Sequence, residues 1–377
     1  MGGMTVVGLH ASHEQVHPTA LLRAVQQAQA AGFGAAMCSD HLAPWSERQG
    51  QSGFAWSWLG AALATTDLPM GCVNAPGQRY HPVIVAQASA TLAAMFPGRF
   101  WVALGSGENA NEHITGDPWP PKAERDARLR ECVDIIRALH AGETVTHRGL
   151  VTVDEARVWT LPDTPPKLIG PAVTSATARA HADWADGLIT TNQPVEKLRE
   201  IVAEYRGAGG RGDLALQVHL SWAHTEEQAL AIAHDQWRTN IYDPPVCWDL
   251  ATPQHFDVVA ADVPPEQVRG TVLVSADVSR LVDQIGELVD VGFDQVYLHH
   301  VGQELEEFVD VFGERVVPQL AGTAATATGA ASSGAASSGT ATSTTPAPRH
   351  AAADPHDPHL YAPEHQQPGP EAEVGHA

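Results

Sequence analysis

The stretch "RYHPVIVAQASATLAAMFPGRFWVALG", residues 79–105, holds one complete helix–strand unit of the chain. A segment of helical periodicity opens at Pro82 and stops at Pro97-Gly98, residues that commonly begin and end helices. The short apolar run 99–105 follows, and its length and composition are typical of a strand that is buried on both faces. The stretch therefore predicts a helix that leads into a buried strand.

The same unit repeats along the chain at an even pitch. Short apolar runs alternate with longer segments of helical periodicity. Strands that alternate with helices pair in parallel, and eight of them predict an α/β fold closed into a (β/α)8 or TIM barrel. Two insertions break the rhythm: residues 144–162 alternate like a hairpin, and residues 238–276 are interrupted by prolines. The eight runs span residues 5–11, 34–39, 68–73, 99–105, 166–171, 186–191, 214–222 and 294–300.

The composition changes at Ala321, where small and polar residues such as "GAASSGAASSG" at 329–339 take over. Such a segment buries too little apolar area to offset the entropy cost of becoming ordered. We therefore expect a barrel domain over residues 1–320 and a disordered tail over residues 321–377. A length of about 320 residues suits one barrel that carries insertions.

Charge and cysteine content exclude several classes of protein. The formal net charge is −22, and basic runs are very short, which disfavours nucleic acid and anionic membranes as partners. The four cysteines, Cys38, Cys72, Cys132 and Cys247, are far apart and fit neither a disulfide framework nor a zinc site. Neither a signal peptide nor a membrane-spanning run is recognised, so we expect a cytoplasmic protein that acts on a small molecule.

Polar residues follow the carboxyl ends of the predicted strands. In a (β/α)8 barrel these ends meet at one mouth, where the chemistry takes place. The sequence therefore predicts that polar groups scattered along the chain converge on one site. The segments are "HASHEQVH" at 10–17, "SDHLAPW" at 39–45, "VNAPGQRYHP" at 73–82, "GSGENANEH" at 105–113, "GPAVTSAT" at 170–177 and "ITTNQP" at 189–194.

The segments "SDHLAPW" and "GSGENANEH", with residues 79–105 between them, resemble the luciferase-like flavin and deazaflavin oxidoreductases. The resemblance is strongest to the branch that contains deazaflavin-dependent glucose-6-phosphate dehydrogenase, and it runs through nearly all of residues 5–320. It implies a barrel whose mouth holds a flavin or deazaflavin ring, used for hydride transfer or, in other branches, for oxygen activation. We expect FMN as the cofactor, with coenzyme F420 as the alternative, and a homodimer.

The resemblance assigns roles to the segment after the second strand. Asp40 would hydrogen-bond the ring or its side chain, His41 would remove the hydroxyl proton of the substrate, and Trp45 would wall the substrate pocket. An imidazole, with an ordinary pKa of ~6.5, is a suitable base for this step. Alternatively, Asp40 caps a helix and His41 is a loop histidine without a catalytic role. The partner motif after the fourth strand favours the catalytic interpretation.

That partner motif supplies the acid of the resembling enzymes. Glu108 would protonate a ring nitrogen, while Ser106 and Asn111 would contact the ring or its tail. Gly107 lets the backbone approach a ligand closely, although a bare Gly-x-Gly is equally typical of an ordinary turn. Glu14 falls where the family places a carboxylate that supports the base, or it is an exposed loop residue.

Two further cofactor contacts are implied by the resemblance. Relatives hold a strained non-prolyl cis peptide behind the ring, at a cost of about 3 kcal/mol, and here Val73 and Asn74 are the candidates. A phosphate of the cofactor would meet the unpaired N–H groups at the start of the helix after the fifth strand, whose residues equally serve as a helix cap. The residues expected at the phosphate are Thr174, Ser175, Ala176 and Thr177.

The predicted substrate carries no phosphate. Sugar-phosphate specificity in the resembling dehydrogenase relies on basic residues at the end of the sixth strand and in the late insertion. The sixth strand here ends in Thr, Asn and Gln, residues 241–277 contain no Lys, and Arg269 is displaced. An anion pocket needs cations, so we expect that glucose 6-phosphate is not the substrate. Trp45, Trp222 and Trp248 instead predict an aromatic mouth.

Two other function classes stay open. A metal-dependent barrel hydrolase would group several His and carboxylate ligands at strand ends. His10 and His13 are the only plausible start of such a set, and no consistent set follows, so we predict no metal. A cofactor-binding subunit without chemistry of its own is the other alternative, and the presence of His41 and Glu108 argues against it.

Overall fold

The computed structural model describes residues 5–326, and the side chains of residues 5–321. Eight parallel strands form its centre, and all eight were predicted from the apolar runs. Each is short and buried along most of its length, as expected for strands covered on both faces. The strands are β1 (Val6–Ala11), β2 (Ala35–Ser39), β3 (Met70–Asn74), β4 (Phe100–Leu104), β7 (Lys167–Pro171), β8 (Leu188–Thr191), β9 (Leu214–Trp222) and β11 (Gln295–His300).

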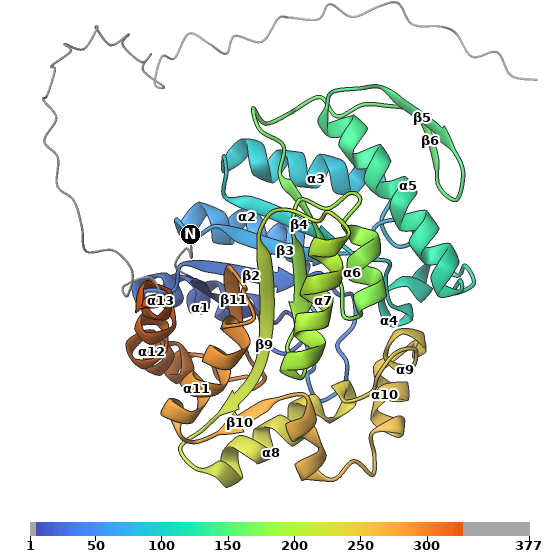
Figure 1. The fold of residues 1–377 in the computed structure, drawn as a ribbon. Helices are drawn as coiled ribbons and strands as arrows, with labels where there is room; N and C mark the ends of the chain where they lie inside the picture. Colours follow the sequence, from blue (N-terminus) through green and yellow to red (C-terminus); the bar gives the residue numbers. More distant parts are fainter. Residues whose placement is uncertain (1–4, 327–377) are drawn as a thin grey trace, which may run out of the picture. The chain divides into compact units, whose positions relative to one another are not determined.

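The eight strands close into a barrel. The sheet runs in the order β9-β11-β1-β2-β3-β4-β7-β8, and β8 also pairs with β9, which completes the circle. All of these pairings are parallel. The predicted (β/α)8 barrel is therefore confirmed (Figure 1).

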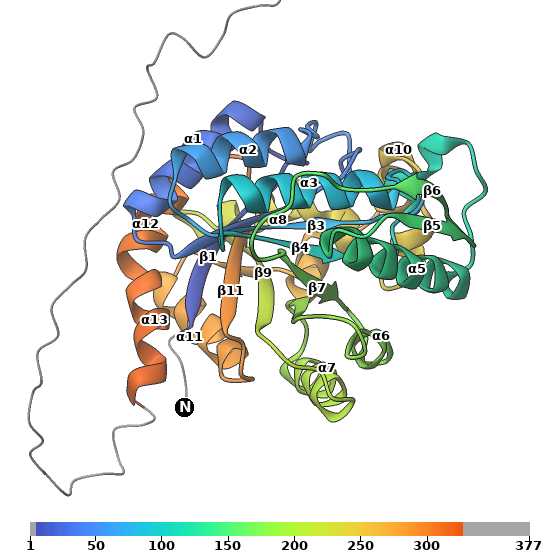
Figure 2. The same cartoon turned by 90° about the horizontal axis from the view of Figure 1, so that it is seen from above.

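Helices connect successive strands and cover the outside of the barrel (Figure 2). Proline opens α1 and α3, where its missing N–H costs no helical hydrogen bond. None of the helices within residues 5–326 is both long and apolar enough to cross a membrane. The main helices are α1 (Pro18–Ala30), α2 (Ala55–Thr65), α3 (Pro82–Met95), α5 (Lys122–His140), α6 (Ser175–His181), α7 (Val195–Gly207), α8 (Glu226–Trp237), α11 (Val278–Val289), α12 (Glu306–Arg315) and α13 (Val317–Thr326).

Both predicted insertions are present. Antiparallel β5 (Val145–Arg148) and β6 (Thr152–Ala156) form a hairpin beside α5 (Figures 1 and 2). The late insertion forms α9 (Val246–Asp249), α10 (Pro253–Val259) and β10 (Leu273–Ser275). A short helix in the loop after β4, α4 (Asn109–Glu112), was not predicted.

Strand β10 extends the sheet at one point of the barrel wall. It pairs with β9 at residues 220–222, whereas β8 pairs with β9 at residues 214–217. Because β11 occupies the other edge of β9, β8 and β10 share one edge and follow each other along it. The late insertion is therefore hydrogen-bonded to the barrel itself.

Helix α13 continues past Leu320, the expected end of the barrel domain, to Thr326. The division into a barrel domain over residues 1–320 and a tail over residues 321–377 stays a prediction. The disorder expected for the rest of the tail concerns residues 327–377, which lie outside the described residues.

Large aromatic side chains fill the barrel near the amino ends of the strands, and glycines make room for them. A Cβ atom built on Gly71 would lie 1.9 Å from the Trp101 indole. A Cβ atom on Gly8 would lie 2.6 Å from the Tyr297 ring. Both aromatic residues pack with the small apolar layer of the interior, which contains Ala103. Glycine at these two positions is therefore a packing requirement.

Two glycine-to-alanine variants test this packing. Gly71→Ala should lower the free energy of unfolding by about 1–3 kcal/mol or more, since the new methyl group overlaps the Trp101 ring. Gly60→Ala is the matched control, because Gly60 lies within α2 and a Cβ there meets nothing within 4 Å. It should raise the free energy of unfolding by about 0.5–1 kcal/mol. Denaturant titrations measure both values, and equal effects would contradict the assignment.

Candidate active site

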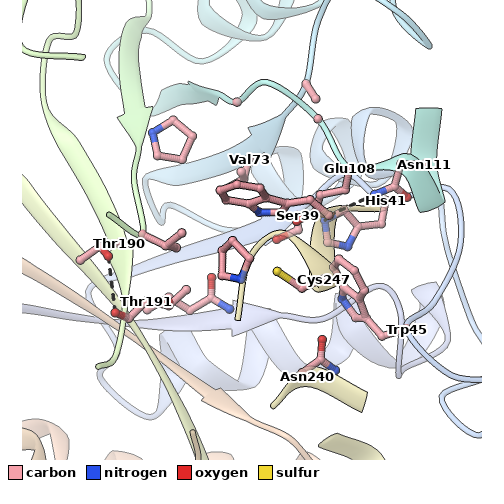
Figure 3. A pocket seen from close by; sticks show the side chains of 18 of the residues that line it. Ser39, His41, Trp45, Val73, Glu108, Asn111, Thr190, Thr191, Asn240 and Cys247 are labelled. Atoms are coloured by element: carbon pink, nitrogen blue, oxygen red, sulfur yellow. Dashed lines mark hydrogen bonds and ion pairs between the residues drawn. The ribbon is translucent and has the colours of Figure 1, made fainter. Parts of the chain in front are cut away.

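A cavity of about 420 Å³ lies at the carboxyl ends of the barrel strands. Its volume falls within the range of about 300–1,000 Å³ that is typical of small-molecule sites. The four residues predicted to be catalytic, Glu14, His41, Trp45 and Glu108, all line it. Figure 3 shows His41, Trp45 and Glu108 on one side of the cavity, with Thr190 and Thr191 of β8 across from them. The predicted convergence at one mouth is therefore present.

Most residues predicted to contact the cofactor also line the cavity. Thr174, Ser175 and Ala176 do not belong to its lining, although Thr177 does. The Thr174 hydroxyl accepts a hydrogen bond from the Thr177 N–H at 3.2 Å, so this residue acts as the cap of α6. The predicted cofactor residues that line the cavity are Asp40, Val73, Asn74, Ser106, Gly107, Asn111 and Thr177.

His41 and Glu14 form a close pair. His41 Nδ1 lies 2.6 Å from Glu14 Oε1, and the Glu14 side chain is only 5% exposed. Ser12 Oγ donates a hydrogen bond to the other Glu14 oxygen at 2.7 Å. His41 Nε2 lies 3.7 Å from Glu108 Oε2. Glu14 is therefore not an exposed loop residue, and it holds His41 with Nε2 toward Glu108.

This arrangement changes the proton affinities of all three groups. Burial alone would lower the pKa of His41, but the charge and hydrogen bond of Glu14 outweigh it and raise the pKa from 6.5 to about 9. Burial alone would raise the pKa of Glu14, but His41 lowers it to about 2. Burial raises the pKa of Glu108, and the nearby His41 only partly offsets this effect. The site therefore combines a protonated imidazole with a carboxyl group that retains its proton more readily than usual.

The same shifts make the pair sensitive to pH. The raised pKa of His41 means that its contribution to stability is complete below pH 6.5 and is lost as the pH rises through about 9. The lowered pKa of Glu14 means that its contribution is complete above pH 4.5 and is lost as the pH falls toward about 2. Both contributions are therefore complete between about pH 4.5 and pH 6.5, where the pair is most stable.

Asp40 lies beneath this pair and is 2% exposed. Its Oδ2 atom accepts hydrogen bonds from Trp56 Nε1 at 3.0 Å and from Asn74 Nδ2 at 2.9 Å. Arg79 Nη2 donates to the Asp40 carbonyl oxygen at 2.6 Å and lies 3.8 Å from Oδ2. Asp40 thus joins the segments that follow β2 and β3, and it is not a helix cap.

The peptide between Val73 and Asn74 is trans, so the predicted cis bond at this position is wrong. The cis peptide bond found within residues 5–326 is Pro244–Pro245. Asp40 N–H donates to the Val73 carbonyl at 2.9 Å, and Gly105 N–H donates to the Asn74 carbonyl at 2.8 Å. These bonds continue the ladders of β3 with both of its neighbours, and they keep the chain extended through Asn74.

The loop after β4 is fixed to the loop after β2. Asn111 Oδ1 accepts hydrogen bonds from the backbone N–H groups of Leu42 at 2.8 Å and Ala43 at 3.4 Å. Gly107 has a φ angle of +83°, a conformation that L side chains rarely adopt. Asn111 Nδ2 lies 3.4 Å from Glu108 Oε2. The Gly-x-Gly segment is thus a turn that presents Glu108 to the cavity next to His41.

The aromatic wall of the mouth is only partly as predicted. The Trp45 ring packs edge-on against the His41 ring, with ring centroids 5.1 Å apart, and against the Phe256 ring of α10, with centroids 5.3 Å apart. Trp248 of α9 also lines the cavity. Trp222 does not, because side chains alternate along β9 and Trp222 points outward, where it packs against Phe312. Trp237 of α8 lines the cavity instead.

Several lining residues were missed by the sequence analysis. Arg79 and Lys122 are cations of the lining. Arg79 lies in the segment 73–82 after the third predicted strand but was given no role, and Lys122 lies outside the predicted strand-end segments. Three polar residues of the barrel interior, Gln217, His219 and His299, were also missed because they lie within strands that were taken as core. For two of them the alternation in "LALQVHLSW" was a usable signal, because polar residues occur there at every second position from Gln217. His10 also lines the cavity and had been considered only as a possible metal ligand.

The alternative of a metal site finds no support in the described part of the chain. His10 stacks on His299 with ring centroids 4.4 Å apart, and His13 packs edge-on against Trp58 at 4.9 Å. His13 does not line the cavity. Within residues 5–326, no three His, Cys, Asp or Glu side chains are grouped as metal ligands would be.

The raised pKa of His41 is directly testable. In an NMR titration of the imidazole resonances, His41 should lose its proton near pH 9. In Glu14→Gln, which keeps the shape but removes the charge, the midpoint should fall by about one unit or more. Burial still lowers the pKa of His41 in this variant, while the carboxylate charge that raises it is gone. His81→Gln is a suitable control for assignment, since its imidazole lies outside the cavity against the Thr152 carbonyl. A midpoint that Glu14→Gln leaves unchanged would contradict the pairing.

Comparison with known proteins identifies the family. A family model described as luciferase-like monooxygenase matches residues 3–295. The chain is 33% identical over 328 residues to the F420-dependent glucose-6-phosphate dehydrogenase of Beutenbergia cavernae, with 84% of this chain and 98% of that protein covered. It is also 33% identical to the enzyme of the same name from Microbacterium testaceum, with 83% and 96% covered.

Solved structures agree with this relationship. An F420-dependent secondary alcohol dehydrogenase in complex with an F420–acetone adduct is 27% identical, with a TM-score of 0.78 and with 84% of this chain and 99% of that chain covered. The 3,6-diketocamphane monooxygenase component from Pseudomonas putida in complex with FMN is 15% identical with a TM-score of 0.63, and it shares the fold alone. The chain is therefore an oxidoreductase, and it belongs to the luciferase-like monooxygenase family.

Proposed function

We propose that this protein is an F420-dependent dehydrogenase or reductase that interconverts an uncharged alcohol and its carbonyl product. The observation that carries the proposal is the His41–Glu14 pair, which presents Nε2 toward the Glu108 carboxyl group inside the cavity. Relatives at 33% identity are named as F420-dependent dehydrogenases of glucose 6-phosphate, and a structural relative at 27% as an F420-dependent secondary alcohol dehydrogenase. The FMN complex shares only the fold, so F420 is preferred to FMN.

The residues present suit a deazaflavin ring. Asn74 Oδ1 is buried in the cavity wall and has no hydrogen-bond partner among the described residues, so a ring N–H would satisfy it. Gly107 lines the cavity and has no side chain that would keep a flat ring away from its backbone. Asp40, Asn74, Ser106 and Gly107 would hold the ring. When bound, the cofactor accepts a hydride from the substrate or returns one to it.

Residues of the protein accept and donate the protons that the reaction releases and takes up. When the carbinol carbon of an alcohol gives up a hydride, the hydroxyl group must also lose its proton. His41 would accept that proton at Nε2 in its neutral form, which predominates above its pKa of about 9, so alcohol oxidation is favoured at alkaline pH. Glu14 stabilises the imidazolium that forms. In the reverse direction, protonated His41 donates the proton to the carbonyl oxygen. Glu108 Oε2 lies 3.7 Å from the same Nε2 atom, and its raised pKa makes it a better proton donor to the ring than an ordinary glutamate.

Removal of the base separates chemistry from binding. His41→Ala should lower kcat for alcohol oxidation by about 10²–10⁴-fold, because the general base is lost. F420 should bind with nearly unchanged affinity, since the expected ring contacts do not include His41. Fluorescence titration of F420 measures binding, and the loss of its oxidised absorption band during turnover measures the rate. Turnover by the variant at the wild-type rate would remove His41 from the mechanism, and binding of FMN in preference to F420 would contradict the cofactor.

The charges of the cavity support an uncharged substrate. Five acidic residues, Glu14, Asp40, Glu108, Glu112 and Asp243, line it. The lining cations already have partners. Arg79 lies 3.7 Å from Glu112 Oε1 and 3.8 Å from Asp40 Oδ2, and Lys122 is paired with Asp126. Neither Lys167 nor Arg269 lines the cavity. A phosphate dianion would therefore meet carboxylates without a free cation among the described lining residues.

Glucose 6-phosphate should accordingly be a poor substrate. Its kcat/KM should be about a hundredfold or more below that of unphosphorylated glucose or propan-2-ol, since two or more charge-assisted hydrogen bonds are missing. Gln193→Lys places a cation in the lining and should improve kcat/KM for the phosphate ester, whereas Gln193→Met, the uncharged control, should not. Efficient turnover of glucose 6-phosphate by the wild-type protein would contradict the predicted uncharged substrate.

A further inference from the structure

One part of the cavity has no role in the reaction described so far. His10 of β1, Gln217 and His219 of β9, and His299 of β11 line the cavity together, and we call them the histidine floor. The residues expected to hold the ring follow β2, β3 and β4, which form a separate arc of the barrel. The histidine floor is therefore a second group of polar side chains within the same cavity.

The hydrogen bonds of the floor fix the proton positions on two rings. Gln15 Nε2 donates to the Val301 carbonyl, so Gln15 Oε1 is the acceptor that lies 2.8 Å from His299 Nε2. His299 Nε2 therefore carries the proton, and its Nδ1 accepts from Gln217 Nε2 at 3.1 Å. The same Gln217 nitrogen donates its second hydrogen to His219 Nε2, which lies 3.1 Å away.

This pattern leaves defined groups for a ligand. His219 accepts at Nε2, so its proton is on Nδ1, which can donate, and the Oε1 atom of Gln217 can accept. His10 is 2% exposed, and its Nδ1 atom has no hydrogen-bond partner within the described residues. Its Nε2 lies 3.4 Å from Ser39 Oγ, a hydroxyl that can donate or accept. His10 Nδ1 can therefore either donate or accept a hydrogen bond, depending on which ring nitrogen carries the proton.

The floor is also uncharged. Burial lowers the pKa of His10 to about 4, despite the nearby Glu14 carboxylate, and the pKa of His219 to about 3. Burial and the neighbouring imidazoles lower the pKa of His299 well below its ordinary value. The Trp237 ring packs against His219, with ring centroids 4.7 Å apart, and edge-on against His299, with centroids 4.9 Å apart. These contacts hold both imidazole rings in place. A neutral, rigid and polar surface favours a neutral polar group over an anion.

We infer that the histidine floor binds a second hydroxyl group of the substrate, so that the substrates are uncharged polyols or unphosphorylated sugars. A hydroxyl group both donates and accepts, and it therefore suits His219 Nδ1, Gln217 Oε1 and either state of His10 Nδ1. One hydroxyl of the substrate meets His41 while another is held on the floor. This inference rests on the proposed function, because it assumes that the first hydroxyl is the one that reacts.

Binding of two alcohols with the same carbon skeleton tests the inference. Glycerol and propan-2-ol are titrated by ligand-observed NMR against the full chain, with and without oxidised F420. The wild-type protein should bind glycerol about tenfold more tightly than propan-2-ol, the effect of about one net hydrogen bond. His219→Phe keeps a ring of similar shape but removes the donor. It should weaken glycerol binding about tenfold and leave propan-2-ol binding within about twofold.

His300→Phe is the matched control. His300 follows His299 on β11 but lies outside the cavity, where it stacks on Phe308 at 4.8 Å. Both affinities should stay unchanged in this variant. If His219→Phe fails to fold, as judged by its melting temperature, Gln217→Met replaces it with the same expectation. Equal affinities of the wild-type protein for both alcohols, or equal losses for both in His219→Phe, would overturn the inference.

Two further outcomes separate the inference from the proposed function. Loss of F420 binding in His219→Phe would assign the floor to the cofactor and overturn its role in substrate binding. Failure of the wild-type protein to bind F420 would contradict the proposed function, whereas the preference for glycerol measured without cofactor would still decide the role of the floor.

Discussion

A buried carboxylate organises the mouth of this barrel. Asp40 is 2% exposed, and an isolated charge at such a position would be very unfavourable. It is compensated by the N–H groups of Trp56 and Asn74 and by the guanidinium group of Arg79, which also contacts Glu112. Trp56 and Arg79 come from the segments after β2 and β3, and Arg79 extends the network to Glu112 after β4, so the partners of one charge connect three loops. His41 and Glu108 are held by the same loops, and their separation follows from this arrangement.

The carboxylates of the cavity differ in how well they are compensated, and this difference assigns their chemistry. Glu14 has a close imidazole partner, and its pKa falls to about 2. Glu108 is 3.7 Å from the same imidazole, and burial raises its pKa. The two glutamates beside one histidine thus shift in opposite directions, since the pKa of Glu14 is lowered and that of Glu108 is raised. Distance and burial, which are properties of the fold, decide between them.

The sequence analysis predicted the barrel well because parallel strands covered on both faces are apolar throughout, and runs such as 34–39 and 68–73 are recognisable as such. Glu14, His41, Trp45 and Glu108 were correctly placed at the cavity because strand ends meet at one mouth and because the motifs resemble a family. The trans peptide at Val73–Asn74 was missed because the strained cis bond was inferred from the relatives. That inference took no account of the backbone hydrogen bonds that Val73 and Asn74 make with the neighbouring strands in this protein. Arg79 was missed because its role depends on contacts between loops that are distant in sequence. Trp222 was misplaced because the alternation along β9 was not applied to it.

Strands β8 and β10 share one edge of β9, so a single strand edge serves two purposes. The first half of the edge closes the barrel, while the second half carries an insertion that brings Cys247 and Trp248 to the cavity. A change within the insertion can therefore alter the lining of the cavity while the strand pairs that close the barrel stay in place. Such a change also reaches the neighbourhood of His41, because Phe256 of the insertion packs against Trp45.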